Sequence, residues 1–282
     1  LTNTGEINTD DSISTPDNVV EYEHLQHPHP VHSIAVSAVS KKDEDKMNEF
    51  LQRAAEEDPT FIINHNQETK ETVISGMGEL QINMILDKIK TNQKVEIQTK
   101  VPKVAYRETI TKPSDAEYTH KKQTGGHGQF GRVLIKINPL ERGKQYEFEN
   151  IIKGGSVSKG YIPGIEKGLH EAMEAGVLAK YPVVDVGITL YDGKEHPVDS
   201  SEMAFKMAAR GALYAAMEKA GPVLLEPIMN LRVFADEEYL GDVLSDLSSR
   251  RGRVSGQEQL GGGIVEVDAQ VPQAEMLRYS ID

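Results

Sequence analysis

The sequence predicts a multidomain α+β protein that contains a ferredoxin-like domain, a different α+β domain and part of a second ferredoxin-like domain. Residues 29–103 show strand-like and helix-like apolar patterns in the order β-α-β-β-α-β, which is the split β-α-β unit. The same order begins again near residue 227. The chain has 282 residues, of which 38% are hydrophobic, and this is enough for two or three packed domains.

The first ferredoxin-like pattern begins with a strand at 31–39, and a capping signal formed by Ser40 and Asp43 indicates a helix after it. Two strands joined by a polar turn are expected within 60–78, and a strand at 93–100 closes the unit. The apolar face expected on the first helix consists of Met47, Phe50, Leu51, Ala54 and Ala55. The face expected on the second helix consists of Leu80, Met84, Ile85 and Ile89.

Residues 104–226 predict an α+β domain of another kind. One helix is expected at 163–180 with Pro163 near its start, and a longer one at 200–221. Gly221 and Pro222 mark the end of the longer helix. The expected strands are 104–110, 118–123, 132–140, 146–152 and 182–193.

The pattern that begins at residue 227 has a strand, an amphipathic helix at 236–252 and two strands within 253–271. A further helix is expected to start with Pro272 near its first turn. A ferredoxin-like unit needs one more strand after that helix, so we expect this last domain to be truncated.

Composition restricts the classes of function. The chain has no cysteine, which excludes disulfides, thiolate metal sites and cysteine nucleophiles, and fits the reducing cytosol. It shows no signal peptide and no apolar run of membrane-spanning length. The net charge of −13 argues against a nucleic-acid binder. The charge is uneven, however, because residues 119–170 hold 9 Lys/Arg against 4 Glu.

The basic segment contains the stretch "KKQTGGHGQFGRV", residues 121–133. It lacks the Lys-Ser/Thr pair of a phosphate loop, and its match to G-x-G-x-x-G precedes a strand. Without a helix N-terminus, the N–H groups that bind phosphate are missing, so a nucleotide site is disfavoured. The alternatives are a hairpin tip whose glycines permit positive φ, or a rigid loop that contacts a partner.

A second polar loop at 191–205 leads into the long helix. Ser200 or Ser201 is expected to cap that helix, and Asp199 suits its positive end. His196 has no obvious partner in the sequence. A catalytic triad of Ser200, His196 and Asp199 is disfavoured, because residues so close in sequence rarely align nucleophile, base and orienting group.

The stretch "LSSRRGRV" places Arg250, Arg251 and Arg253 where the last amphipathic helix ends. Complementarity to the helix dipole with Gly252 as the stop residue explains them as well as contact with a phosphate backbone does. No metal-ligand spacing is recognisable, and the histidine-rich residues 23–32 are typical of a linker.

Nine stretches occur in an order that closely resembles the C-terminal half of translation elongation factor G. They are "HPVHSIAV", "EEDPTF", "ISGMGELQ", "VAYRETI", "KKQTGGHGQFGRV", "YIPGIEKGL", "VDSSEMAFKMA", "LLEPIMNLRV" and "GDVLSDLSSRRGRV". The resemblance extends over nearly the whole chain from about residue 12 onward.

The resemblance implies a domain for each part of the chain. Residues 1–28 resemble the tail of the β-barrel domain II and a linker, and 29–103 the ferredoxin-like domain III. Residues 104–226 resemble domain IV, an α+β domain of the ribosomal protein S5 domain 2 type, and 227–282 the start of domain V. The GTP-binding domain is not among these parts, so we expect no GTPase activity from this chain. GTP and Mg²⁺ are expected only in that domain, and this chain is expected to need no cofactor or metal.

In the family, domain IV mimics the anticodon end of a tRNA and enters the decoding region of the small ribosomal subunit during translocation. The resemblance therefore implies contacts with ribosomal RNA, tRNA and mRNA at two tip loops, with Arg132 as further counter-charge. It also implies that the arginine cluster of domain V faces the factor-binding centre of the large subunit. The residues expected to contact the ribosome are Lys121, Lys122, Gly125, Gly126, His127, Gly128, Gln129, His196, Arg250 and Arg251. We expect a cytoplasmic monomer that does not bind membranes.

The sequence departs from the family pattern at one place and leaves the role open. Family members commonly carry His-Leu-Glu after "GMGEL", whereas this chain has Gln81, Ile82 and Asn83, which puts the coupling to the GTPase domain in doubt. The stretch "HKKQTGGHGQFG" is also similar to divergent second paralogues, some of which serve ribosome recycling. The alternatives are such a paralogue, a ribosomal protection protein of the tetracycline-resistance type, or a small-molecule kinase of the galactokinase–homoserine kinase group.

Overall fold

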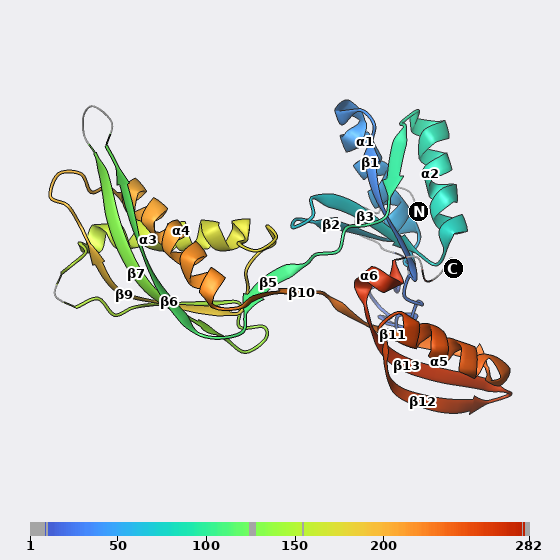
Figure 1. The fold of residues 1–282 in the computed structure, drawn as a ribbon. Coiled ribbons are helices and arrows are strands. Elements are labelled where there is room, and N and C mark those ends of the chain that lie inside the picture. The colour runs from blue at the N-terminus through green and yellow to red at the C-terminus, as the bar shows by residue number, and fades with distance from the viewer. Residues whose placement is uncertain (1–8, 10, 124–127, 154, 278, 280–282) are drawn as a thin grey trace. The chain divides into compact units, whose positions relative to one another are not determined.

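The computed structural model describes residues 9, 11–123, 128–153, 155–277 and 279. The chain divides into two compact units (Figure 1). Unit 1 consists of Leu1–Val104 and Pro227–Asp282, and unit 2 consists of Ala105–Glu226. Each part is described separately below.

The N-terminal part of unit 1 has the predicted ferredoxin-like order. Its elements are β1 (His32–Ala38), the 3-10 turn η1 (Lys41–Asp43), α1 (Glu44–Glu57), β2 (Ile62–Asn66), β3 (Glu71–Gly76), α2 (Glu79–Gln93) and β4 (Ile97–Lys100). The strands form one antiparallel sheet in the order β2-β3-β1-β4. Side chains from the sheet and both helices share one core, which includes Leu51, Phe61, Ile74 and Ile89.

One local prediction for this part was wrong and another was only half right. Ser40 makes no side-chain cap to a helix, because the chain first forms the turn η1 through a bond from the Asp43 N–H to the Ser40 carbonyl. On α2 the buried side chains are Ile82, Ile85 and Ile89.

The predicted α2 face was right for Ile85 and Ile89 but wrong for Leu80 and Met84, because α2 carries apolar side chains on two sides. At about 100° per residue, the three buried isoleucines cluster on one side of the helix, while Leu80 and Met84 lie nearly opposite. Leu80 is 76% exposed and Met84 is 56% exposed. Only the isoleucine side meets the sheet.

Gln81, the first residue of the departure from the family pattern, bonds within its own domain. Its Nε2 donates to Asp58 Oδ2 at 2.6 Å and to Thr60 Oγ1 at 2.9 Å, and its Oε1 accepts from the Met77 N–H at 2.6 Å. The hydrogen bond from Thr60 to Asp58, helped by the Gln81 bond, lowers the pKa of the Asp58 carboxyl. Gln81 therefore ties the start of α2 to the loop after α1, while Asn83 is exposed.

The C-terminal part of unit 1 is a three-stranded sheet with a helix on one face. Its elements are β11 (Ile228–Asp236), η3 (Glu237–Tyr239), α5 (Leu240–Ser249), β12 (Arg253–Gly261), β13 (Ile264–Pro272) and α6 (Gln273–Met276). The antiparallel order is β11-β13-β12. The turn between β12 and β13 needs its glycines, because Gly261, Gly262 and Gly263 all have positive φ.

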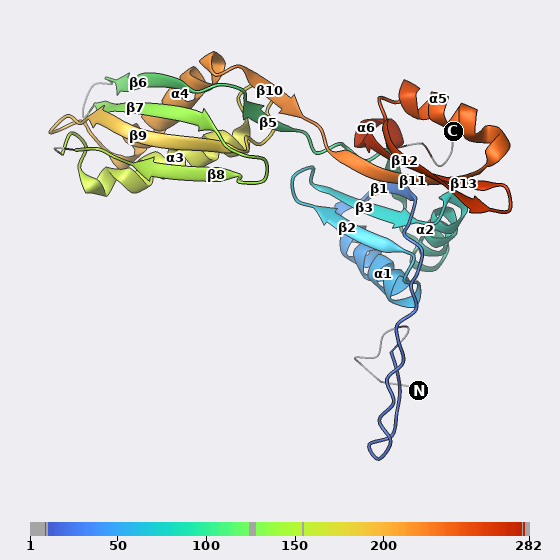
Figure 2. The ribbon, with the colours of Figure 1, turned by 90° about the horizontal axis from the view of Figure 1, so that it is seen from below.

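Unit 2 is a sheet covered on one face by two helices (Figure 2). Its elements are β5 (Arg107–Ile110), β6 (Ser114–Lys122), β7 (Gln129–Pro139), β8 (Tyr146–Asn150), η2 (Lys159–Tyr161), α3 (Ile162–Ala175), β9 (Val186–Lys194), α4 (Glu202–Lys219) and β10 (Pro222–Leu225). The sheet order is β6-β7-β9-β8, in which only β8 and β9 pair in parallel. The strands β5 and β10 form a separate antiparallel ribbon.

The core of unit 2 depends on close approach of its helices. Alanines 208, 209, 212 and 216 of α4 are fully buried against the sheet and α3. On α3, a Cβ at Gly168 would lie 2.4 Å from the Lys206 carbonyl oxygen, so only glycine fits at this crossing. Pro163 lies in the first turn of α3 as predicted.

Glu108 of β5 is a buried carboxylate that organises the segment after α3. Its Oε2 accepts from the N–H groups of Val177 at 2.6 Å and Leu178 at 2.8 Å, and its Oε1 accepts from Ala179 at 2.6 Å and Tyr181 at 3.1 Å. Burial would raise the pKa of the Glu108 carboxyl, but the four backbone hydrogen bonds outweigh it and the pKa is lowered.

Candidate nucleic-acid interface

Three connections meet at one end of unit 2, which we call the loop end (Figure 1). Its described residues are 128–130 at the start of β7, 155–158 between β8 and η2, and 195–201 between β9 and α4. Hydrogen bonds between these segments, given below, establish that they are neighbours.

Seven of the predicted contact residues lie within 121–129, and the structure describes four of them. Lys121 and Lys122 are the last residues of β6 and are exposed, and Lys122 pairs in register with Gln129. The Gln129 side-chain oxygen lies 2.9 Å from Nε2 of His120, across the two strands. Gly128 precedes β7. Gly125, Gly126 and His127 fall outside the described residues.

The glycine-rich stretch leads into a strand, as predicted, because β7 begins at Gln129. No helix N-terminus follows it, so the dipole and unpaired N–H groups of a phosphate-binding loop are missing at this point of the described chain. Its two described glycines have packing reasons. A Cβ at Gly128 would lie 3.0 Å from the Asp199 carboxylate, and one at Gly131 would lie 3.0 Å from the backbone of Ala204 in α4.

The role of Arg132 as counter-charge stays a prediction, and the structure gives this residue a partner within the sheet. Its guanidinium forms an ion pair with Glu117 of the neighbouring strand β6, and the hydrogen bond to Glu117 raises the pKa of Arg132. The Arg132 side chain is 38% exposed, and an ion pair at such a position holds its partners only weakly.

His196 has partners, although the sequence showed none. Its Nδ1 accepts from the N–H groups of Val198 at 3.3 Å and Asp199 at 3.2 Å, and its ring centroid lies 6.0 Å from that of Phe130. The side chain is 48% exposed. The histidine therefore closes its own loop and still presents one edge of the ring to solvent.

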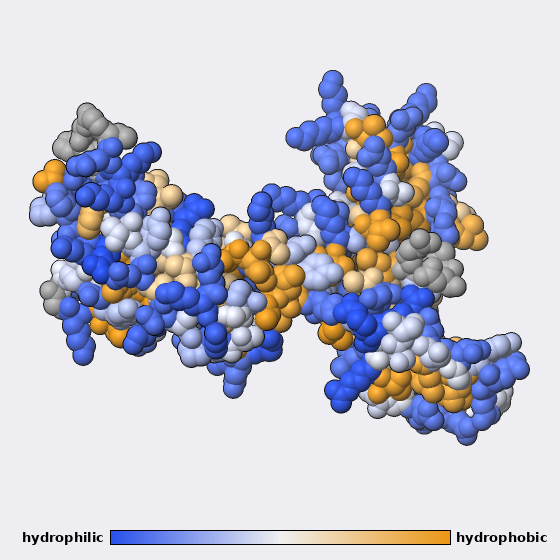
Figure 3. Space-filling view, in the orientation of Figure 1, coloured by the Kyte–Doolittle hydropathy of each residue, from blue (hydrophilic) through white to orange (hydrophobic). Residues whose placement is uncertain are grey.

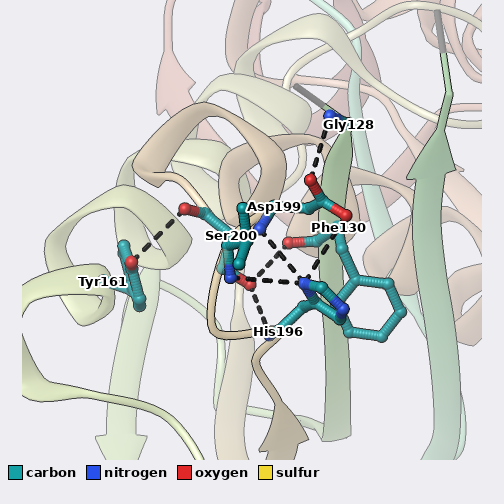
Figure 4. A network of polar contacts seen from close by, with 7 residues as sticks. Gly128, Phe130, Tyr161, His196, Asp199 and Ser200 are labelled. Carbon is teal, nitrogen blue, oxygen red and sulfur yellow. Dashed lines mark hydrogen bonds and ion pairs between the residues drawn. The ribbon is translucent and has the colours of Figure 1, made fainter. Parts of the chain in front are cut away.

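Ser200, Asp199 and His196 do not form a catalytic triad. The Ser200 hydroxyl accepts from the backbone N–H of His196 at 2.8 Å and donates to the backbone carbonyl of Phe130 at 2.9 Å. The hydroxyl proton therefore points to a backbone oxygen and not to the imidazole ring (Figure 4). Ser201, the other capping candidate, caps α4 by accepting from the Ala204 N–H at 3.2 Å.

Asp199 and Ser200 join this loop to the start of β7. Asp199 Oδ1 accepts from the Gly128 N–H at 3.0 Å, and the Asp199 carbonyl accepts from the Phe130 N–H at 2.8 Å. Phe130 and Ser200 form an isolated parallel bridge. Figure 4 shows these bonds converging between the two segments.

Glu195 joins the same loop to the third segment. Its carboxylate accepts from the Ser158 N–H at 2.8 Å and from the Ser158 hydroxyl at 3.0 Å. Both bonds lower the pKa of the Glu195 carboxyl, and the bond from the Ser158 backbone N–H contributes most. No local sequence pattern indicates this contact, because Ser158 and Glu195 are 37 residues apart.

The exposed charge at the loop end is mainly positive. The lysines that are exposed at or next to its three segments are Lys121, Lys122, Lys153, Lys159 and Lys194. Glu195 and Asp199 bond to backbone N–H groups of neighbouring segments, while the exposed carboxylates next to the segments are Asp192 and Glu202. Figure 3 shows mostly hydrophilic residues over the described part of this end. The arrangement suits a polyanion, and none of the described residues at this end is placed for covalent chemistry.

The arginine cluster of unit 1 is anchored within its own part of the chain. The Arg250 guanidinium bonds to the Asp246 carboxylate at 2.9 Å and to the Glu275 carbonyl at 3.1 Å, and it lies over the ring of Tyr279. Arg251 Nε lies 3.0 Å from Glu275 Oε1, and this side chain is 51% exposed.

The helix α5 does not end at Gly252 in the way that the sequence predicts. The residue with left-handed φ is Arg251, at 60°, and not Gly252. Gly252 is required for another reason, because a Cβ there would lie 2.6 Å from the Leu247 carbonyl oxygen. None of the arginines lies in the last turn of α5 itself, and Arg250 is its C-cap.

Within the described ranges, no three His, Asp or Glu side chains gather where they could hold a metal ion. No helix in that part of the chain is long and apolar enough to cross a membrane.

Comparisons with known proteins match all three parts of the chain to one family. Residues 27–101 match the model of elongation factor G domain III, residues 102–221 match elongation factor G domain IV, and residues 223–282 match the elongation factor G C-terminus. A crystal structure of a protein from Thermus thermophilus is similar at 42% sequence identity with a TM-score of 0.74. The match covers 91% of this chain and 38% of that one, so this chain spans less than half the length of that protein.

Proposed function

The chain belongs to the elongation factor G family, and from this premise we propose that it is the ribosome-contacting C-terminal part of a translocation factor. Unit 2 would enter the decoding region of the small subunit with its loop end and contact ribosomal RNA, tRNA and mRNA. None of the three matched models is a GTP-binding domain, and the proposal assigns GTP and Mg²⁺ to another domain of the full-length factor. The factor would act in the cytoplasm.

The observation that carries the proposal is the separation of charge at the loop end. On an acidic chain, exposed lysines surround this end, while Glu195 and Asp199 bond inward to backbone N–H groups. Lysines that meet phosphates release counterions, which produces salt-dependent binding without a base code. Single-stranded RNA is recognised by its shape and by stacking of unpaired bases, and a narrow loop end fits such a target.

A double substitution of Lys121 and Lys122 by Ala tests the proposal. We expect weaker co-sedimentation of the chain with 70S ribosomes, by about 3- to 30-fold at low salt. We also expect the slope of log K against log salt to fall by about 1 to 2, since each lost phosphate contact lowers it by roughly 0.7 to 1. Both lysines are exposed, so the melting temperature should stay close to that of the unsubstituted chain.

The matched control is the double substitution of Lys112 and Lys144 by Ala. These lysines are exposed in connections at the opposite ends of β6 and β7, so the net charge changes equally far from the loop end. Equal losses in the two double variants would show a general charge effect and contradict a specific contact at the loop end.

A further inference from the structure

Resting on the function proposed above, we propose that Glu195 and Asp199 are positioning residues that hold the three segments of the loop end as one RNA-contacting surface. Acidic side chains are unexpected at a surface that contacts phosphates, because each adds repulsion. The contacts of these two carboxylates provide a physical reason for their presence.

Asp199 connects the segment 195–201 to the β6–β7 hairpin. Its carboxylate faces Gly128 so closely that a Cβ at that glycine would lie 3.0–3.1 Å from the carboxylate atoms. It accepts the N–H of Gly128, which lies within the glycine-rich stretch. The adjoining backbone bond from Phe130 and the Ser200 hydroxyl bond fix the same junction.

Glu195 connects the other end of the same segment to residues 155–158. Both of its oxygens accept from one residue, Ser158, at 2.8 Å and 3.0 Å. The nearby Asp192 accepts from the N–H of Gly193 at 2.8 Å, which orients the end of β9 just before Glu195. The segment 195–201 is thus bonded to residues 155–158 through Glu195 and to the start of β7 through Asp199.

A carboxylate at this surface could act in two ways, and the two predict opposite changes in RNA affinity when it is removed. If the negative charge only opposes phosphate, removing it strengthens binding to RNA. If the carboxylate holds a neighbouring segment in place, removing its acceptor oxygens frees that segment and weakens binding, because a binding surface loses affinity when its parts must be ordered on contact.

Asparagine and alanine at position 199 separate these effects. Asp199→Asn removes the charge but keeps an acceptor oxygen for the Gly128 N–H. We expect Asp199→Asn to bind ribosomes at least as tightly as the unsubstituted chain, and Asp199→Ala to bind about 3- to 10-fold more weakly. The same order is expected for Glu195→Gln and Glu195→Ala.

Amide hydrogen exchange supplies a second readout that does not involve the ribosome. Exchange at Gly128 should accelerate in Asp199→Ala, and exchange at Ser158 should accelerate in Glu195→Ala, with smaller changes in the Asn and Gln variants. Asp115→Ala is the matched control, since it removes an exposed acidic side chain near the opposite end of β6. It should alter neither exchange rate.

The outcomes separate this inference from the function on which it rests. Tighter ribosome binding by Asp199→Ala than by Asp199→Asn, or unchanged Gly128 exchange in Asp199→Ala, would overturn the positioning role and leave the proposed function intact. If the unsubstituted chain fails to bind ribosomes at low salt, the proposed function and the RNA part of the inference fall together. The exchange rates would still decide whether the carboxylates hold the segments.

Discussion

Substitution of Glu108 by Gln is expected to destabilise unit 2 by about 2–6 kcal/mol. The carboxylate of Glu108 accepts four backbone N–H groups, two on each oxygen. A glutamine amide offers only one oxygen, so its NH₂ group would face two N–H donors. Each buried donor left without an acceptor costs about 1–3 kcal/mol. Urea denaturation, followed by a probe of unit 2, measures the loss.

The same carboxylate makes the stability of unit 2 depend on pH. Its pKa is lower in the folded than in the unfolded chain, so its contribution is fully present above the usual glutamate pKa of about 4.3. The contribution is lost as the pH falls through the folded-state value. In Glu108→Gln this part of the acid sensitivity should disappear. Glu149→Gln, the same change at an exposed position of β8, should alter neither the stability nor its pH dependence.

Substitution of Gly168 by Ala is expected to destabilise unit 2 by about 1–3 kcal/mol. Alanine favours a helix interior over glycine by about 1 kcal/mol, which alone would stabilise α3. At this position, however, the added Cβ would lie 2.4 Å from the Lys206 carbonyl oxygen and 3.0 Å from two further backbone atoms of α4. Backbone atoms of a packed helix cannot rotate away as a side chain can, so α3 and α4 must move apart. The cost of this overpacking outweighs the gain in helix propensity.

Gly241→Ala is the matched control for this prediction. Gly241 also belongs to a helix, as the second residue of α5, but nothing is within 4 Å of the Cβ that alanine would add. We therefore expect Gly241→Ala to stabilise its own part of unit 1 by about 0.5–1 kcal/mol. Thermal unfolding should thus shift in opposite directions for the two Gly→Ala variants. A loss of stability at both glycines would show that the Gly168 effect does not come from the contact with α4.

Local periodicity predicted the order of most elements, because most strands and helices carry their own apolar pattern, but it missed the short strand β10. The helix α1 illustrates this, since its predicted face includes the buried Met47 and Leu51. The helix α2 shows the limit, because its apolar residues lie on two sides and only the position of the sheet decides which side is buried. The fold class was predictable where pattern and tertiary packing agree.

The candidate site was predictable only in part. Lys121, Lys122 and Gln129 could be placed on a hairpin from the alternation of strand residues around a glycine-rich stretch. The bonds of Glu195 to Ser158 and of Asp199 to Gly128 join positions 37 and 71 residues apart, and no local pattern indicates such pairs. For the same reason the ion pair of Arg132 with Glu117, which depends on strand register, was missed.

The ribbon of β5 and β10 has a consequence for how unit 2 could be exchanged between proteins. Arg107 and Leu225 are register partners, so the chain enters and leaves this unit at adjacent points. A unit with its two ends side by side can be cut out and closed by a short linker, or transplanted into a surface turn of another host, without stretching either backbone. Residues 105–226 can therefore be moved as one unit, and their loop end can be redesigned without changing the fold of the protein that receives them.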